Sequence, residues 1–308
     1  MRLATALLIL CALVSASDAA SRKAADAKKT TDPKKITFAP FKDELFQYPK
    51  VLSETPDGSR VVIDFSRQRD VDGRDSHPET QADADRVSLD VDKKQSDLKL
   101  SDAGVEVSFV SVGDFTKPAK FAFIFVHGAN GDRYQGVSDE TFGGNFNRLK
   151  NLVVNAGGIY LSPGMRNQTS IGTAQAKLLI TEFEKRSPGA PVYVACASNG
   201  GKICARLLED ASIAPVLGGV VLLGSTSATS IARNGEAVAR RVPIVVAHGT
   251  GDYIVSWFGA SRLYKELRAK DPAYPVRLLL FQTGKHGTPM RMIDWRAELN
   301  WMLAAKGK

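Results

Sequence analysis

Cysteine and histidine are scarce in this sequence, which has three Cys and four His among its 308 residues. So few cysteines exclude a disulfide-rich scaffold. The histidines form no ligand cluster with one another and the cysteines offer no metal framework, so we expect no bound metal. Clusters of Lys and Arg with interleaved aromatic residues are also missing, which argues against nucleic acid as a partner.

Long apolar runs are missing as well. The run Leu7–Val14 is shorter than the ~20 residues of a membrane span, and no later segment is long and apolar enough, so no transmembrane segment is expected. The remaining composition, 44% hydrophobic and 24% charged, is that of a globular protein and excludes a wholly disordered or collagen-like chain. The formal net charge of +8 suggests weak attraction to an anionic envelope surface.

The first residues have the pattern of a secretory signal. Arg2 precedes the apolar run, and Ser17-Asp18-Ala19 supplies the small residues of a cleavage site, so we expect a signal peptide over residues 1–19 that is cut after Ala19. An uncleaved anchor is the alternative. The mature protein would be secreted or periplasmic, with a flexible basic linker over 20–40 and a single domain over 41–308.

Apolar segments alternate with amphipathic ones along most of the chain. The alternation predicts an α/β fold with a mostly parallel sheet covered by helices on both faces. Predicted strands are Arg60–Ser66, Val105–Val112, Phe121–Val126, Gly158–Leu161, Pro191–Ala195, Gly219–Leu223, Pro243–Ala247 and Val276–Phe281. Predicted helices are Asn145–Val154, Ile171–Lys185, Gly200–Leu208, Ser256–Ala269 and Met290–Ala305.

A polar excursion over residues 67–102 interrupts this pattern, with one weak strand expected at Val87–Val91. Within it, spaced carboxylates surround Gly73 in the segment Asp70–Asp75. The closing Glu of a calcium loop is missing, so we interpret the segment as an Asp-Gly hairpin turn.

The residues that follow the predicted strand Pro191–Ala195 indicate a catalytic site. They are Cys196-Ala197-Ser198-Asn199-Gly200-Gly201, and a helix begins there. A serine on a tight strand-to-helix turn presents its hydroxyl at the carboxyl edge of the sheet, where ligands bind in such folds. Because Cys196 ends a strand and Cys204 faces the core from the helix, we expect two buried thiols, with a disulfide as the alternative.

The segment Cys196–Gly200 resembles the G-x-S-x-G motif of the α/β-hydrolase superfamily, with Cys in place of the first Gly. The order Ser198, Asp252, His286 at three separate strand ends is similar to the family's catalytic triad, and the loop His127-Gly128-Ala129 looks like its oxyanion loop. The resemblance covers about residues 60–305. It implies an α/β-hydrolase fold and a serine nucleophile that needs no cofactor. The family usually inserts its cap where this chain has only the short, polar connection Ser225–Val242, so we expect no large cap domain.

Each matched residue has a role under this resemblance. Ser198 would attack the substrate, His286 would act as base, Asp252 would orient the imidazole, and the backbone N–H groups of Ala129 and Asn199 would form the oxyanion hole. Taken singly, Ser198 could be a helix cap and the other two could be loop residues. Candidate substrate-lining residues are Arg166, Ser225 and Thr226, which follow strands at the same edge.

The sequence therefore predicts an exported serine hydrolase that cleaves a carboxylic ester through an acyl-enzyme. The ester could be a small molecule or could be displayed on a polymer. The alternatives are a peptidase or amidase with the same triad, and a non-catalytic binding protein on the same scaffold.

Overall fold

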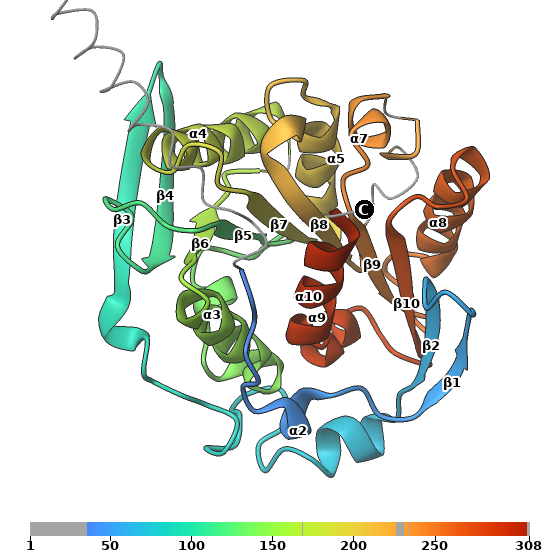
Figure 1. Cartoon of the computed structure of the whole chain (residues 1–308). Helices are drawn as coiled ribbons and strands as arrows, with labels where there is room; N and C mark the ends of the chain where they lie inside the picture. The colour runs from blue at the N-terminus through green and yellow to red at the C-terminus, as the bar shows by residue number, and fades with distance from the viewer. Residues whose placement is uncertain (1–35, 168, 226–230, 234, 307–308) are drawn as a thin grey trace, which may run out of the picture.

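One ten-stranded sheet organises the computed structural model, which describes residues 36–167, 169–225, 231–233 and 235–306. Its order is β1-β2-β10-β9-β8-β7-β5-β6-β4-β3 (Figure 1). Parallel pairing joins the central strands β2, β10, β9, β8, β7, β5 and β6, in that order across the sheet. The antiparallel strand β1 lies at one margin, and the antiparallel strands β4 and β3 lie at the other. The strands are Val51–Glu54 (β1), Arg60–Asp64 (β2), Gln95–Asp102 (β3), Val105–Val112 (β4), Ala122–Val126 (β5), Ile159–Gly164 (β6), Val192–Ala197 (β7), Leu217–Leu223 (β8), Ile244–Gly249 (β9) and Val276–Gln282 (β10). The predicted mostly parallel sheet is confirmed.

Helices cover both faces of the sheet. On one face lie α4, α5, α7 and α8, and on the other lie α3, α9 and α10 (Figure 1). Strand residues are buried on both faces and contribute to two hydrophobic clusters, one on each side. This double burial explains the continuous apolar runs of the central strands. The helices are Asp43–Phe46 (α2), Asn145–Asn155 (α3), Ser170–Arg186 (α4), Gly201–Glu209 (α5), Gly235–Ala239 (α7), Trp257–Lys270 (α8), Thr288–Met292 (α9) and Trp295–Lys306 (α10).

The segment predicted as one helix over Met290–Ala305 is two helices. The chain becomes extended at Ile293 between α9 and α10. The Asp294 side chain accepts the backbone N–H of Ala297 at 3.3 Å, so it caps the start of α10. Asn145 donates to the carbonyls of Met290 and Ile293 at 3.0 and 2.9 Å, which satisfies the groups that the break leaves free.

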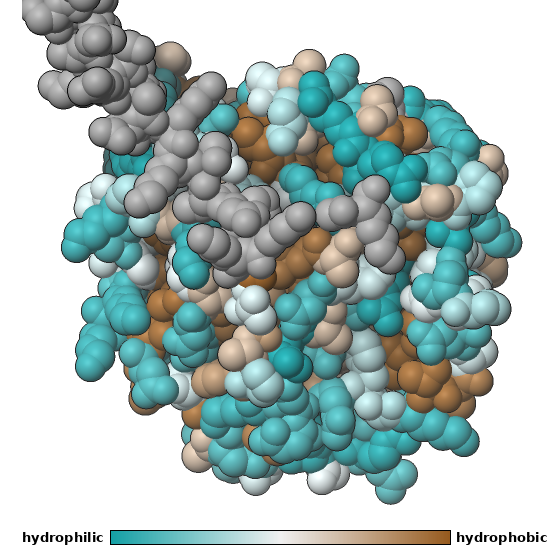
Figure 2. Space-filling model, viewed as in Figure 1, coloured by the Kyte–Doolittle hydropathy of each residue, from teal (hydrophilic) through white to brown (hydrophobic). Residues whose placement is uncertain are grey.

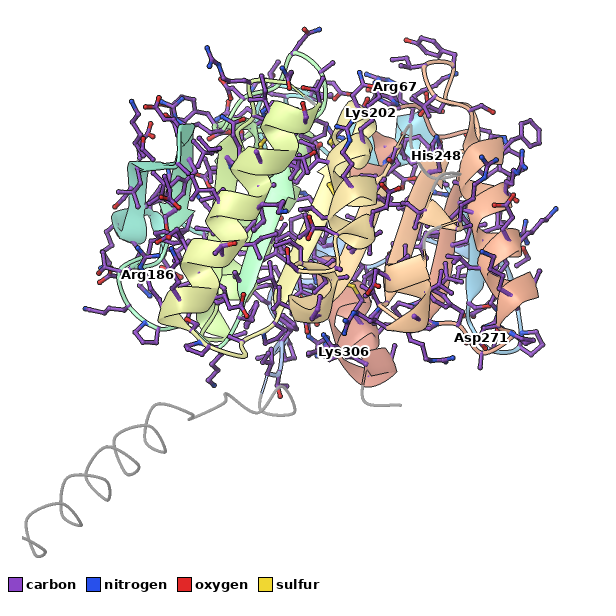
Figure 3. All side chains as sticks on the ribbon, turned by 90° about the horizontal axis from the view of Figure 1, so that it is seen from above. Arg67, Arg186, Lys202, His248, Asp271 and Lys306 are labelled. Carbon is purple, nitrogen blue, oxygen red and sulfur yellow. A yellow bond between two sulfur atoms is a disulfide. The ribbon has the colours of Figure 1, made fainter. Side chains whose placement is uncertain are left out.

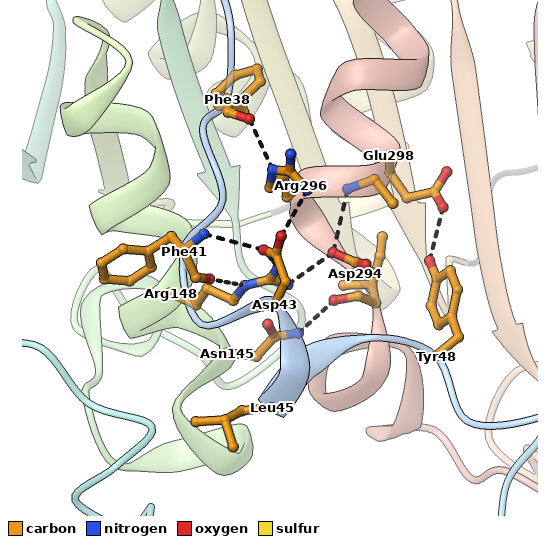
Figure 4. Close-up of polar contacts among 12 residues, drawn as sticks. Phe38, Phe41, Asp43, Leu45, Tyr48, Asn145, Arg148, Asp294, Arg296 and Glu298 are labelled. Atoms are coloured by element: carbon orange, nitrogen blue, oxygen red, sulfur yellow. Dashed lines mark hydrogen bonds and ion pairs between the residues drawn. The ribbon is translucent and has the colours of Figure 1, made fainter.

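The predicted linker over 20–40 is wrong for residues 36–40. Ile36 and Phe38 are buried, and the Phe38 ring packs edge-on against a core phenylalanine of the sheet. Arg296 and Arg148 donate to the carbonyls of Phe38 and Phe41, and both arginines bind the Asp43 carboxylate at 2.7 and 2.8 Å (Figure 4). The folded domain therefore begins no later than residue 36. The predicted signal peptide over 1–19 and the linker over 20–35 lie outside the described residues.

The excursion over 67–102 is more structured than predicted. Its last eight residues form β3, whose side chains are mostly exposed because the strand lies at the sheet margin. The strand expected at Val87–Val91 is absent, and that segment consists of turns and irregular chain. The hairpin expected at Asp70–Asp75 is also wrong, since a short π-helix over Gln68–Asp72 stands there and is followed by a buried cluster around Asp75.

Figures 1 and 2 view the edge at which the parallel strands begin, and polar side chains cover most of it, with hydrophobic residues showing toward the middle. Figure 3 separates the two edges: Lys306, Arg186 and Asp271 lie at this one, and Arg67, Lys202 and His248 lie at the opposite edge. None of the helices in the described part of the chain is long and apolar enough to cross a membrane.

Candidate active site

Ser198 stands on a strained turn between β7 and α5. Its φ of 50° is in the left-handed region, which an L side chain seldom occupies. The turn fits because its neighbours are glycines. A Cβ atom at Gly128 would lie 2.9 Å from the Ser198 Cβ, and one at Gly200 would lie 2.7 Å from the His127 carbonyl oxygen. The predicted tight turn is confirmed, with Ser198 at the carboxyl end of a central strand.

The two cysteines beside this turn are joined, contrary to the expectation of buried free thiols. Cys196 ends β7, Cys204 lies in α5, and their Cα atoms are 6.2 Å apart, within the range that a disulfide spans. The side chain that replaces the first glycine of the family motif points toward the helix and is accommodated by this bond. The disulfide therefore closes the loop of chain that carries Ser198.

Asp252 and His286 meet, as the predicted order implies. His286 Nδ1 lies 2.7 Å from Asp252 Oδ2, while Asp252 Oδ1 accepts the backbone N–H groups of Ile254 and Val255 at 2.8 and 3.0 Å. Burial raises the pKa of the Asp252 carboxyl, but the hydrogen bonds from Val255, His286 and Ile254 outweigh it and hold the pKa below its usual range. The carboxylate stays charged and can orient the imidazole.

Backbone hydrogen bonds hold the acid loop and the histidine loop together. Thr250 donates to the Phe281 carbonyl and Gly251 donates to the Gly284 carbonyl, both at 2.9 Å. On the other side, a Cβ atom at Gly224, the residue after β8, would lie 3.4 Å from His286 Nδ1. The ends of β7, β8, β9 and β10 thus bring the Ser198 turn, Gly224, Asp252 and His286 to one edge of the sheet.

A second histidine, His248, contacts the same carboxylate. His248 Nε2 lies 2.9 Å from the Val255 carbonyl oxygen and 3.2 Å from Asp252 Oδ2. The ring is fully buried, and burial lowers its pKa. We infer a neutral ring whose Nε2–H donates to both oxygens. The only sequence signal was its place at the end of a strand, four residues before Asp252.

His127 fixes the loop that was predicted to supply an oxyanion amide. Its Nε2 accepts the backbone N–H of Met165 at 3.0 Å, so Nδ1 carries the proton and donates to the Gly128 carbonyl at 2.7 Å. In a trans peptide the N–H points opposite to the carbonyl, so the Ala129 N–H is directed away from the His127 ring. Asn199 is the second residue of a short 3₁₀ helix, where the N–H has no partner within the helix.

The predicted substrate-lining residues have different outcomes. Arg166 lines a cavity of about 640 Å³ at this edge. Ser225 is buried instead, since a Cβ atom at Gly201 would collide with its hydroxyl, and it packs on the start of α5. Thr226 lies outside the described residues. No group of three or more metal-binding side chains occurs in the part of the chain that the structure describes.

A smaller cavity, of about 140 Å³, lies beside the histidine loop and was not predicted. Residues of the excursion and residues that flank His286 line it together. They are Phe65, Arg67, Val71, Glu79, Thr283, Lys285, Gly287, Thr288 and Arg291. The excursion therefore reaches the rim of the candidate active site.

No family model matches the chain, and no curated protein matches it. Among solved structures, an esterase from Pyrococcus furiosus superposes with a TM-score of 0.50 and 13% identity, over 68% of this chain and 90% of that one. A serine hydrolase without a lid from Xanthomonas campestris gives 0.48 and 12%, over 68% and 94%, and a serine hydrolase homologue from Coxiella burnetii gives 0.47 and 14%, over 66% and 95%. The chain has the α/β-hydrolase fold.

Proposed function

We propose that this protein is an exported serine hydrolase that cleaves a carboxylic ester. The observation that carries the proposal is the short contact between His286 and Asp252, made at the same sheet edge as a serine held on a strained strand-to-helix turn. Serine is too weak an acid to attack an acyl carbon unaided, and this arrangement supplies a base and a group that orients it.

In the proposed mechanism His286 Nε2 removes the proton of the Ser198 hydroxyl as Oγ attacks the ester carbon. The tetrahedral oxyanion is held by the N–H groups of Ala129 and Asn199, and removing one such donor typically costs about 3 kcal/mol of transition-state stabilisation. His286 then gives its proton to the leaving alcohol. Water, activated by the same imidazole, releases the acid from Ser198.

Export is the second part of the proposal. A disulfide between Cys196 and Cys204 is typical of proteins that leave the reducing cytoplasm. The pattern of residues 1–19 fits a cleaved signal, and the net charge of +8 would favour weak association with an anionic envelope surface. An ester is proposed as substrate because the Pyrococcus furiosus protein of the same fold is named an esterase.

The test is covalent labelling with a fluorophosphonate followed by peptide mass spectrometry. The adduct should lie on Ser198, and Ser198→Ala should abolish both labelling and hydrolysis of nitrophenyl acetate. Ser101→Ala, a change on the exposed margin strand β3, is the matched control and should keep both. An adduct on another residue, or faster cleavage of a matched anilide than of the ester, would contradict the proposal.

A further inference from the structure

The cavity beside Arg166 opens at the same edge as Ser198. Its walls are the start of β4, the end of β6, the start of α4 and an arginine from the loop after β5. The residues are Gly104, Val105, Glu106, Ser108, Arg133, Gly164, Arg166, Ser170, Ile171, Ala174 and Gln175. With a volume of about 640 Å³ it can hold a substantial part of a small-molecule ligand.

The register of the strands gives the distance between this cavity and the candidate nucleophile Ser198. Val126 of β5 pairs with Cys196 of β7, and Ile124 of β5 pairs with Leu161 of β6. Continued past the strand ends, this register places Ser198 and Met165 at about the same level, two strands apart. Adjacent strands lie about 4.8 Å apart, so Met165 is about 10 Å from Ser198, and Arg166 follows it.

The lining carries positive charge. Arg133 is bound to Asp97 at 2.9 Å, and Glu106 is bound to Lys99 at 2.6 Å. Arg166 is exposed and forms no ion pair with any residue that the structure describes. Its backbone is fixed, because its N–H donates at 3.1 Å to the side chain of the buried Gln175.

The start of α4 adds to this field. The first turn of a helix has N–H groups without partners in the helix and a partial positive charge. Ser170 and Ile171, in that turn, line the cavity, and the side chain of the preceding Thr169 forms no capping hydrogen bond. Arg166, which forms no direct ion pair with the described residues, and the start of α4 therefore line the same cavity. Glu106, the nearby opposite charge in the lining, is itself bound by Lys99.

We propose that this cavity binds an oxyanion, a carboxylate or a phosphate, at the far end of the substrate, two to three strand spacings, roughly 10–14 Å, from the ester that Ser198 attacks. The inference rests on the proposed function and narrows its substrate class to anionic esters. The Arg166 guanidinium donates to the oxyanion, and the apolar side chains of Val105 and Ile171 pack against the linking carbons.

The first test compares two esters of equal length. One is the mono-nitrophenyl ester of suberic acid, which keeps a terminal carboxylate, and the other is its neutral methyl ester; a nitrophenyl hexanoate with a terminal phosphate forms a third arm. The ratio of kcat/KM for the charged over the neutral ester should fall about tenfold in Arg166→Gln. Arg240→Gln, which makes the same charge change just before β9 at the opposite edge, should leave the ratio unchanged.

The second test measures binding without turnover. Suberate is titrated calorimetrically into Ser198→Ala alone and combined with Arg166→Gln or Arg240→Gln. Weaker binding in the Arg166 variant alone supports the cavity, and equal affinity in all three overturns it even if neutral esters are cleaved. If wild type cleaves no ester, the proposed function fails and the titration still decides the cavity.

Discussion

Asp252 is the residue at which most polar contacts of the candidate site converge. It accepts two backbone N–H groups through Oδ1, while His286 and His248 both approach Oδ2. Its side chain is fully shielded from solvent, so each hydrogen bond to the carboxylate stabilises its charge more strongly than it would in water. The carboxylate is therefore fixed in position before any substrate arrives, which is what orienting His286 requires.

His248 should make the folded state sensitive to mild acid. Burial lowers its folded pKa below the value of about 6.5 for an unfolded His, so below pH 6.5 the unfolded chain binds a proton that the folded chain does not. Stability should fall with pH from 6.5 down to the folded pKa, by up to about 1.4 kcal/mol per pH unit. In His248→Gln, whose side-chain amide can still donate to Asp252, that component should vanish.

Urea unfolding at pH 7.5, 6.5 and 5.5 measures the difference between the two proteins. The buried Glu298, whose pKa burial raises to about 7, works in the opposite direction, since its contribution is present below about pH 4.5 and is lost as pH rises through 7. It is present in both proteins and cancels. Parallel stability curves for wild type and the Gln variant would contradict a neutral, buried His248.

The sequence singled out Ser198, Asp252 and His286 as candidates because each follows an apolar strand in the order of a known motif. It could not place His248 against Asp252. That contact depends on the chain turning back so that the Val255 carbonyl meets the ring, a feature of loop geometry that periodicity does not encode. The prediction that Ser225 lines the substrate was wrong for a similar reason, because only the packing of β8 against α5 decides that Ser225 is buried.

At the level of elements, the central strands and β4 were predictable from the sequence, and the two outermost strands, β1 and β3, were not. Strands buried on both faces are continuous apolar runs, whereas all four residues of β1 and most of β3 are exposed and look like loop in the sequence. The split of the last helix depends on Asp294 acting as a cap, which a helical pattern of apolar residues conceals. The Cys196–Cys204 bond depends on the crossing of β7 and α5, which fixes the Cα separation.

Removing that disulfide should destabilise the domain. In the chain-entropy model, closing a loop of about eight residues is worth about 2–3 kcal/mol, so Cys196→Ala/Cys204→Ala should lower the melting temperature by roughly 5–10 °C. Calorimetry compares oxidised wild type, wild type that was reduced while unfolded, and the double variant. The comparison separates the stability contributed by the bond from the stability lost with the two sulfur atoms. Two free thiols in denatured wild type that has not been reduced would contradict the bond itself.

At the scale of the whole molecule, buried ion pairs attach the excursion to the domain. The Asp75 carboxylate binds Arg74 at 2.8 Å and Arg291 of α9, and Arg86 lies 3.7 Å away. Farther along, Lys150 of α3 binds Asp92 at 2.9 Å. If the excursion swung open as a hinged lid, Asp75 and Glu79 would leave the buried Arg291 of α9, and a buried charge left without its partner costs about 3–5 kcal/mol.

An apolar rim beside the candidate site is already exposed. Tyr253, Ile254 and Phe258 follow Asp252 and are 83%, 61% and 67% exposed. In lid-gated enzymes such a surface appears only when the lid opens at an interface. The described part of the β8–β9 connection includes the five-residue helix α7.

We therefore predict no activation at a lipid-water interface. A series of nitrophenyl esters from acetate to palmitate, measured below and above the concentration at which the longest forms aggregates, should show no jump in rate at that threshold and no preference for the longest chains. The physical reason is that the rim and the excursion have one arrangement in both conditions, so an interface has no closed state to open.

A steep rise in rate on crossing the threshold, with long chains preferred, would mean that the contacts of Asp75 and Asp92 do open and that the excursion acts as a lid. Arg291→Gln, which removes one of those contacts, would then lower the threshold effect, because the open form would be populated without lipid.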